Sequence, residues 1–222
     1  MIRINKLFLL IFLFFILTTY SFNEQKKNIS IIFPIKEIII ESTIAVDLIK
    51  LKSDLDFLNN TSLFFLKKEK VIAVTNKYEF ISSFQLKKKY PNILKISIFE
   101  KIPVAIKIIE KDKYYITKNN EKINYIVLKT YKDLPMIFGR HKNFSFFFKD
   151  LEKSNFIIDK IKAFYYFDIG RWDIVLKNEK IIKLPEKDYQ DILLKVNLIL
   201  DDDNFSKYKI FDYRIKDQLI LQ

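Results

Sequence analysis

The stretch that decides the fold is Lys89–Ala105, with the sequence KYPNILKISIFEKIPVA. Pro91 and Asn92 are typical of a tight turn, because proline fixes φ and asparagine tolerates unusual backbone angles. After this turn, every second residue from Leu94 to Ile98 is a leucine or isoleucine, which is the pattern of a half-buried strand. Residues 82–88 are expected to form the preceding strand. The stretch therefore predicts a β-hairpin.

The residues around this hairpin predict a small two-layer module. Ile35–Ile40 indicates a first strand, and Ser42 and Thr43 can each cap the helix that follows. An apolar stripe at helical spacing predicts that helix, with Ile44, Leu48, Leu51, Leu55 and Leu58 facing inward. A second helix is expected over Lys67–Thr75. The order strand, helix, helix, strand, strand favours an α+β fold in which the helices cover one face of the sheet.

A second module, rich in strands, is expected from Glu110 onward. The apolar alternation that resumes at Val104 ends at Ile109, and the charged run Glu110–Lys113 follows it. We therefore predict the boundary at 109–110. The elements expected beyond it are a strand and turn over Tyr114–Glu121, a helix over Asn143–Lys153, strands within Ile157–Phe167 and from Arg171, a helix opened by Pro185-Glu186 and stopped by Asp201–Asp203, and two late strands within Lys209–Leu221.

Four segments, in this order, resemble the FtsQ/DivIB family of bacterial division proteins. They are YPN with the later Glu and Pro-Val-Ala at 90–105, LPMIFG at 134–139, GRWDIVLKNEKIIKLPE at 170–186, and YKIFDYRIKDQLIL from Tyr208. The resemblance implies a POTRA domain followed by a β domain. Two features depart from the family pattern: Glu41-Ser42 stands where a glycine usually ends the first strand, and the turn near Asn119 also lacks its glycine.

The N-terminus predicts a membrane segment. Leu7–Phe22 is uncharged and follows Arg3 and Lys6, so we expect a cytoplasmic N-terminus, with the rest of the chain on the outer side of the membrane. Lys26 and Lys27 follow the segment closely and reduce the difference in positive charge between its two ends. The run is slightly short for a spanning helix, so a cleaved signal peptide is the alternative. With no cysteine, a lipoprotein anchor is excluded. The expected layout is a tail (1–6), a transmembrane anchor (7–22), a linker (23–30), a POTRA domain (31–109) and a β domain (110–222).

Composition argues against several functions. The net charge of +12 invites a nucleic-acid interpretation, but the lysines are spread throughout and only four arginines occur, so we expect no nucleic-acid binding. Two glycines leave no glycine-rich phosphate loop. The one histidine, His141, has no cysteine to pair with, and Asp201–Asp203 lacks the glycine and distal glutamate of a calcium loop. We expect no catalytic site, no metal and no cofactor.

The resemblance implies a non-enzymatic scaffold in the inner membrane at the division septum. Its partners would be FtsB-like and FtsL-like proteins and, through them, the septal peptidoglycan synthase complex. Trp172 is interpreted as a core residue. The last strands are expected at an uncovered sheet edge that accepts a partner strand. The residues expected to bind the partner are Arg171, Ile210, Phe211, Tyr213, Arg214, Ile215, Leu219, Ile220 and Leu221.

Three other classes of protein were weighed against this interpretation. A secreted or periplasmic basic binding protein requires a cleaved N-terminus. A POTRA-bearing outer-membrane assembly factor normally carries repeated POTRA units or a long β-barrel segment. A periplasmic enzyme requires a catalytic cluster. The sequence favours the division scaffold because the four matched segments occur in the family's order.

Overall fold

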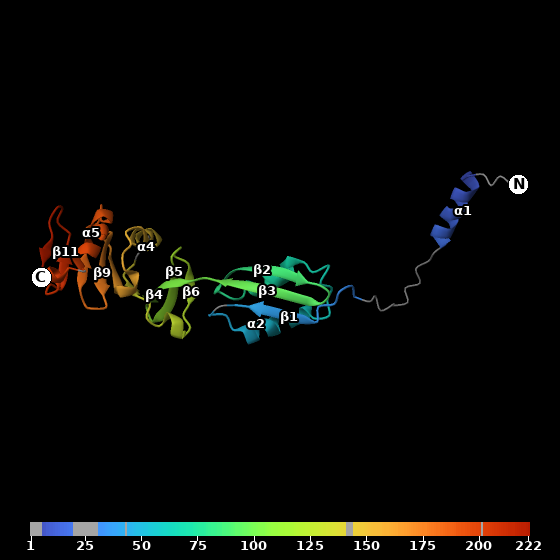
Figure 1. Cartoon of the computed structure of the whole chain (residues 1–222), viewed down its shortest axis with the longest axis horizontal. Helices are drawn as coiled ribbons and strands as arrows, with labels where there is room; N and C mark the ends of the chain where they lie inside the picture. Colours follow the sequence, from blue (N-terminus) through green and yellow to red (C-terminus); the bar gives the residue numbers. More distant parts are fainter. Residues whose placement is uncertain (1–5, 20–30, 43, 141–143, 201) are drawn as a thin grey trace.

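The computed structural model describes residues 6–19, 31–42, 44–140, 144–200 and 202–222 (Figure 1). Five α-helices and twelve strands occur in these ranges. The helices are α1 (Lys6–Thr19), α2 (Leu48–Leu55), α3 (Lys68–Thr75), α4 (Phe144–Lys153) and α5 (Gln190–Leu200). None of the helices in the described ranges has the length and apolar character needed to cross a bilayer. The expected tail and linker fall mostly outside these ranges, as does the end of the expected anchor.

The first sheet has three strands in the order β1-β3-β2. Their bounds are β1 (Glu37–Glu41), β2 (Ile81–Lys89) and β3 (Ile93–Glu100). β2 and β3 form the expected antiparallel hairpin around Pro91 and Asn92, and β1 adds in parallel to β3 with Glu37 opposite Ile93. Leu94, Ile96 and Ile98 are buried, as the alternation predicted. They pack with α2 and α3 in one core.

The cap of α2 differs from the prediction. The helix begins at Leu48, and the Asp47 carboxylate accepts hydrogen bonds from the backbone N–H groups of Ile49 and Lys50. Ser42 is not the cap; its hydroxyl donates to Glu100 instead. Thr43 lies outside the described residues. Since the helix starts later than expected, Leu48 at its first turn is exposed, as is Ile44 before it, whereas Leu51, Leu55 and Leu58 are fully buried.

Glu100, the last residue of β3, holds the connection between β1 and α2. Its carboxylate accepts the Ser42 hydroxyl and three backbone N–H groups: those of Ile44 at 3.1 Å, Ala45 at 2.9 Å and Val46 at 3.2 Å. A carboxylate that accepts several hydrogen bonds from N–H and O–H groups is a strong acceptor. Glu100 therefore fixes the loop across the end of the three-stranded sheet.

The second sheet has nine strands in the order β12-β11-β10-β9-β8-β7-β4-β5-β6. Their bounds are β4 (Pro103–Ile109), β5 (Asp112–Thr117), β6 (Lys122–Asn124), β7 (Met136–Phe138), β8 (Ile161–Phe167), β9 (Arg171–Leu176), β10 (Ile181–Lys183), β11 (Ile210–Asp212) and β12 (Ile220–Leu221). Helices α4 and α5 pack on one face of it through Phe147, Leu193 and Val196. As the sequence analysis expected, Trp172 is buried in this core.

Strand β4 corrects one assignment of the sequence analysis. We placed residues 103–109 in the first module, but β4 pairs with β5 and β7 in the nine-stranded sheet. The change of sheet therefore falls between Glu100 and Pro103. The division of the chain into domains at 109–110 stays a prediction.

A second correction concerns the start of α5. Pro185-Glu186 does not open the helix, which begins only at Gln190. The residues between them form an irregular segment that contains Asp188 at φ 58, a conformation that cannot belong to a right-handed helix. The helix ends at Leu200, before the acidic run, as expected.

The hairpin of β4 and β5 serves both hydrophobic cores. Ile106 and Tyr115 lie opposite each other and contribute to the core of the three-stranded sheet. Ala105 and Ile116, also opposite each other, contribute to the core under α4 and α5. The Tyr115 ring contacts Phe80 edge-on at 5.9 Å between centroids, and its hydroxyl donates to the Ile126 carbonyl. The two sheets thus meet through packed side chains, and they lie end to end in Figure 1.

We predict that Glu100→Ala lowers the free energy of unfolding by about 1–3 kcal/mol, because three backbone N–H groups and one hydroxyl lose a charged acceptor. Glu100→Gln should cost less, since its amide oxygen can still accept. Chemical denaturation followed by circular dichroism measures both. The same change at exposed Glu152 serves as the control, with an expected effect within about 0.5 kcal/mol. Equal stability of Glu100→Ala and Glu152→Ala would contradict the assigned role.

Candidate functional site

The C-terminal end of the nine-stranded sheet is an open edge. β12 is the terminal strand in the sheet order and pairs antiparallel with β11, with Phe211 opposite Leu221 and Asp212 opposite Ile220. β11 in turn pairs in parallel with β10. Figure 1 shows β11 and the C-terminus at the end of the body away from α1. The structure therefore brings the late strands to a sheet edge, where the sequence analysis expected them.

The backbone of Leu221 is directed away from the sheet. Gln222 and Ile210 exchange both hydrogen bonds, with Ile210 N to Gln222 O at 2.9 Å and Gln222 N to Ile210 O at 3.1 Å. In an antiparallel pair, such closely bonded positions alternate with positions whose N–H and C=O point outward. The next position, Leu221, is thus the one whose backbone groups face away from β11. A strand laid alongside β12 could bond to them.

The expected partner-binding residues separate onto the two faces of this edge. Phe211 and Tyr213 are buried, and half-buried Leu219 and Leu221 pack with them on the face that α4 and α5 cover. The opposite face, which we call the open face, carries the others that lie in strands: Arg171, Ile210 and Ile220. Arg214 and Ile215 are exposed in the loop after β11.

A row of charged residues crosses the open face. Lys183 of β10 lies opposite Asp173 of β9 on one side and Asp212 of β11 on the other. Arg171 donates through Nε to Asp173 at 3.1 Å. Arg214 binds Asp212 with two bonds, Nε to Oδ1 at 2.8 Å and Nη2 to Oδ2 at 2.6 Å. The two arginines expected at the site therefore flank one continuous charged row.

The two carboxylates of this row differ in pKa. The hydrogen bond from Arg214 outweighs burial and lowers the pKa of Asp212 below its ordinary value. For Asp173, burial outweighs the attraction of Arg171, so the pKa of Asp173 is raised. Asp212 is hence well stabilised as an anion. For Asp173, the attraction of Arg171 only partly offsets the free-energy cost of burying the charged carboxylate.

Apolar side chains lie beside the charged row on the open face. Ile181 lies opposite Val175 of β9 on one side and opposite Ile210 of β11 on the other, and all three side chains are half-buried. Further along the same face, Phe138 stacks on Tyr165 with 4.8 Å between ring centroids. None of the helices in the described ranges packs on this part of the sheet. The open face combines apolar surface with charge, which is the composition of many protein interfaces.

A groove of about 610 Å³ runs between α5 and the loop that joins β11 to β12. Ile192 and Lys195 line it from the helix, and Tyr213 and Ile215 line it from the loop side. The Tyr213 hydroxyl is buried without a hydrogen-bond partner among the described residues. Burial raises its pKa to about 12, so it stays a protonated donor. The groove lies next to the edge strand, and charged side chains such as Asp191 and Lys195 line it beside the apolar ones.

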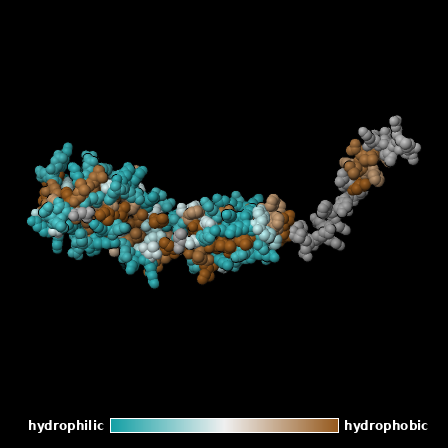
Figure 2. All heavy atoms as spheres, viewed as in Figure 1, coloured by the Kyte–Doolittle hydropathy of each residue, from teal (hydrophilic) through white to brown (hydrophobic). Residues whose placement is uncertain are grey.

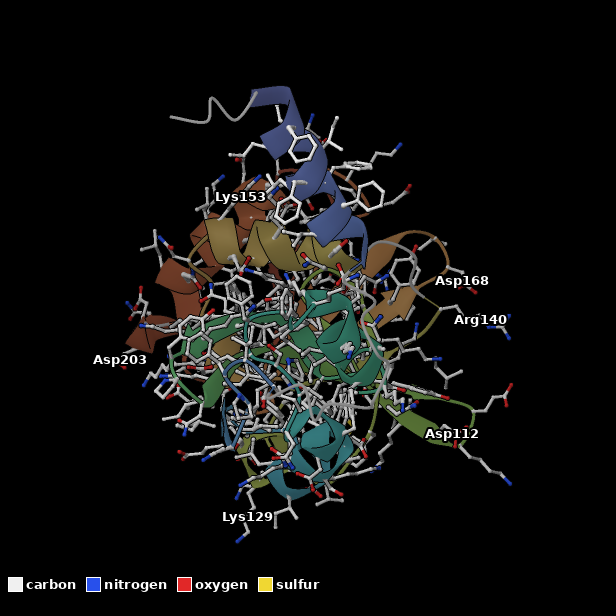
Figure 3. All side chains as sticks on the ribbon, turned by 90° about the vertical axis from the view of Figure 1, so that its right-hand side faces the viewer. Asp112, Lys129, Arg140, Lys153, Asp168 and Asp203 are labelled. Carbon is white, nitrogen blue, oxygen red and sulfur yellow. The ribbon has the colours of Figure 1, made fainter. Side chains whose placement is uncertain are left out.

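Metal-ligating residues do not gather in the part of the chain that the structure describes. No group of three or more His, Asp or Glu side chains that could hold a metal occurs there. In Figure 3, Asp203 lies on the opposite side of the view from Arg140 and Asp168. His141 and Asp201 lie outside the described residues.

Comparisons with known proteins show similarity to FtsQ cell division proteins. Residues 33–101 match the family model described as the POTRA domain, FtsQ-type. The cell division protein FtsQ of Rickettsia typhi is 25% identical over 194 residues, which cover 86% of this chain and 73% of that protein. The cell division protein FtsQ of Rickettsia prowazekii is 26% identical over 198 residues, covering 86% and 72%. The chain thus contains an FtsQ-type POTRA domain and is similar to FtsQ cell division proteins over most of its length.

The match to the FtsQ-type POTRA domain ends at residue 101, directly after β3. The POTRA domain thus comprises the three-stranded sheet with α2 and α3, and a β-rich region follows it. The similarity to FtsQ proteins continues through this region, because it spans 86% of the chain. The resemblance found in the sequence analysis is confirmed by these matches.

Sequence reasoning missed the inner members of the charged row, Asp173, Lys183 and Asp212. Each is polar and flanked by apolar residues within a strand, and this was the available signal. Their alignment depends on β11 returning parallel to β10 after α5, which local patterns do not specify.

We predict that Asp212→Asn lowers the free energy of unfolding by about 1–2 kcal/mol at pH 7, because Arg214 loses a charged acceptor. A lowered pKa means that the contribution of Asp212 is present above its ordinary pKa of 3.8 and is lost as the pH falls through its folded-state value. The difference between the wild type and this variant should therefore shrink at acidic pH. Urea denaturation at several pH values measures it.

Asp173→Asn is the matched control for this prediction. Because burial raises the pKa of Asp173, its charge contributes less at pH 7, and the variant should lose less stability than Asp212→Asn. Equal losses at pH 7, or a loss for Asp212→Asn that does not change with pH, would contradict the assignment.

Proposed function

We propose that this chain is a membrane-anchored, non-enzymatic scaffold of the division machinery. Its C-terminal sheet edge binds an FtsB-like and FtsL-like pair, and through that pair it helps to control septal peptidoglycan synthesis. The FtsQ-type POTRA domain and the similarity to proteins named as cell division proteins support the division role. The observation that carries the binding proposal is the open edge at β12.

A partner segment binds at this edge by strand addition. Leu221 directs its N–H and C=O away from β11, and a partner strand pairs with them, continuing the sheet. Main-chain bonds of this kind give affinity, and side-chain contacts select the partner. Such an addition also covers the exposed side of β12, which otherwise presents unpaired backbone groups.

Selectivity comes from the surfaces on either side of β12. On the open face, Arg171 and Arg214 each use part of the guanidinium group for an aspartate, and their other N–H groups can bind carboxylates of the partner. The groove can receive the segment that precedes or follows the added strand, with Ile192 and Lys195 along its helix wall. Exposed Ile215 supplies apolar contact at the groove wall.

Helix α1 is the basis for the proposed anchor. Its side chains from Phe8 to Ile16 are apolar and exposed. A stretch of this kind is stable in the apolar interior of a membrane and costly in water. We propose that the segment 7–22 stays attached and holds the chain in the inner membrane, with residues 1–6 cytoplasmic and the POTRA and C-terminal regions periplasmic.

We predict that Leu221→Pro weakens capture of the partner pair at least tenfold. Proline removes the N–H that faces the added strand, whereas the bonds between β12 and β11 come from the neighbouring positions. Ile215→Glu should also weaken binding, by about 2 kcal/mol if Ile215 is a central contact. Affinity is measured on the full chain in nanodiscs with an FtsB-like and FtsL-like pair, and circular dichroism confirms the fold.

Leu198→Glu on the exposed side of α5 is the control for these variants and should bind as the wild type does. Wild-type affinity of folded variants at Leu221, Arg214, Ile215 and Leu219 would remove this edge as the binding site.

We predict that the N-terminal segment is retained in the mature protein. Mass spectrometry of the chain isolated from membranes should give the intact N-terminus, and protease added to spheroplasts should digest the residues beyond the anchor. A mature chain that starts near Asn23 would instead establish a cleaved signal peptide.

A further inference from the structure

The end of the POTRA domain away from the nine-stranded sheet carries a cluster of exposed apolar side chains. Three segments meet there: residues 31–37, 60–67 and 88–93. The exposed fractions of the clustered side chains run from 42% to 67%, and the residues are Ile31, Ile32, Phe33, Phe64, Phe65 and Tyr90. Figure 2 shows hydrophobic atoms gathered at this end of the body. We call this surface the apolar tip.

Hydrogen bonds between the three segments fix the apolar tip. Leu63 N donates to Phe33 O at 2.8 Å, and the Ser62 hydroxyl donates to Ile32 O at 2.7 Å. Lys88 Nζ donates to Phe64 O at 2.9 Å. The Phe33 ring lies edge-on to Tyr90 with 5.0 Å between centroids. These contacts between the three segments therefore hold the apolar side chains at the surface.

Phe33, within the apolar tip, has an unfavourable backbone conformation. Its φ is 52°, in the left-handed region that a bulky side chain rarely adopts because its Cβ crowds the backbone. Such a conformation costs free energy and persists only where its surroundings enforce it. Here the result is an aromatic ring exposed to solvent rather than one buried in the core.

Positive charge surrounds the apolar tip. The three segments contain four lysines, Lys36, Lys67, Lys88 and Lys89, and a single acidic residue, Glu37. Exposed aromatic rings beside lysines are typical of surfaces that sit in a lipid headgroup layer, because the rings suit the interface and the ammonium groups attract anionic lipids. A partner surface of apolar and acidic character would satisfy the same chemistry, and anionic phospholipid has both.

The chain itself brings such a surface within reach. Only residues 20–30 separate α1 from the first residue of the apolar tip, and 11 residues span at most ~40 Å even when fully extended. If α1 is held in a membrane, the apolar tip is confined to the zone next to that membrane, at a high effective concentration.

We propose that the apolar tip binds the surface of an anionic phospholipid bilayer, with its aromatic side chains in the headgroup layer and the exposed Lys36 and Lys89 against the lipid phosphates. This inference rests on the proposed membrane anchor. It gives the POTRA domain a function of its own: the domain docks onto the membrane end-on, and the opposite end of the body, with β12, points away from the bilayer.

The experiment uses the full chain in vesicles of phosphatidylcholine with one quarter phosphatidylglycerol. Since the chain has no cysteine, Lys67→Cys or Asp168→Cys places a single fluorophore at the apolar tip or on a distant loop. Lipids that carry a nitroxide near the headgroup quench a fluorophore at the membrane surface. We expect quenching at position 67 to exceed that at position 168 at least threefold, and to fall in vesicles of phosphatidylcholine alone.

Phe64→Ser combined with Phe65→Ser should abolish the excess quenching at position 67. The matched control, Ile44→Ser combined with Ile49→Ser, removes two exposed apolar side chains from the same domain near Glu100, at the end of β3 opposite the apolar tip, and should leave quenching unchanged. Circular dichroism confirms that each variant folds.

The outcomes separate this inference from the anchor proposal. A chain that floats with the vesicles but shows equal quenching at 67 and 168 overturns the inference and leaves the anchor standing. A chain that does not float overturns both. Self-quenching between labelled copies, without quenching by the nitroxide lipids, would assign the apolar tip to contact with a second copy and would also overturn the inference.

Discussion

The pleat of β4 and β5 is the constraint on which the two sheets depend. Successive residues of a strand point to opposite faces, so Ala105 and Ile106 enter different hydrophobic cores although they are neighbours in sequence. Their partners Ile116 and Tyr115 do the same from the second strand. One hairpin therefore forms a wall between the POTRA core and the core under α4 and α5. A shift of one residue in its register would exchange the contributions to both cores at once.

This double burial explains what could be predicted from the sequence and what could not. The hairpin at Pro91 and Asn92 follows from a local turn signal and alternation and was predicted from them, whereas the edge position of the late strands was expected from the family resemblance. The boundary was placed at 109 because the apolar alternation ends there, yet β4 is apolar on both faces since it serves two cores. The alignment of Asp173, Lys183 and Asp212 could not be predicted, because it arises from pairing between strands separated by α5.

The one departure from the family pattern in the POTRA domain also has a physical account. The sequence has Glu41-Ser42 where a glycine usually relieves the backbone at the end of the first strand. In the structure, the Ser42 hydroxyl and the N–H groups of residues 44–46 converge on Glu100. A charged acceptor at the end of β3 thus orders the connection into α2, and this ordering does not require the conformational freedom of glycine. The later start of α2, with Asp47 as its cap, follows from the same arrangement.

The shared wall also couples the two proposed binding surfaces. The apolar tip lies at one end of the body and β12 at the other, and the junction between them is packed rather than flexible. Bending it would separate Tyr115 from Phe80 and break the hydrogen bonds between Glu79 and Asn124 at 2.6 and 2.7 Å. The packing at this junction therefore opposes bending between the two sheets. Because β4 lies in the second sheet while Ile106 enters the POTRA core, one strand links both cores, and the relative placement of the two sheets depends on that strand.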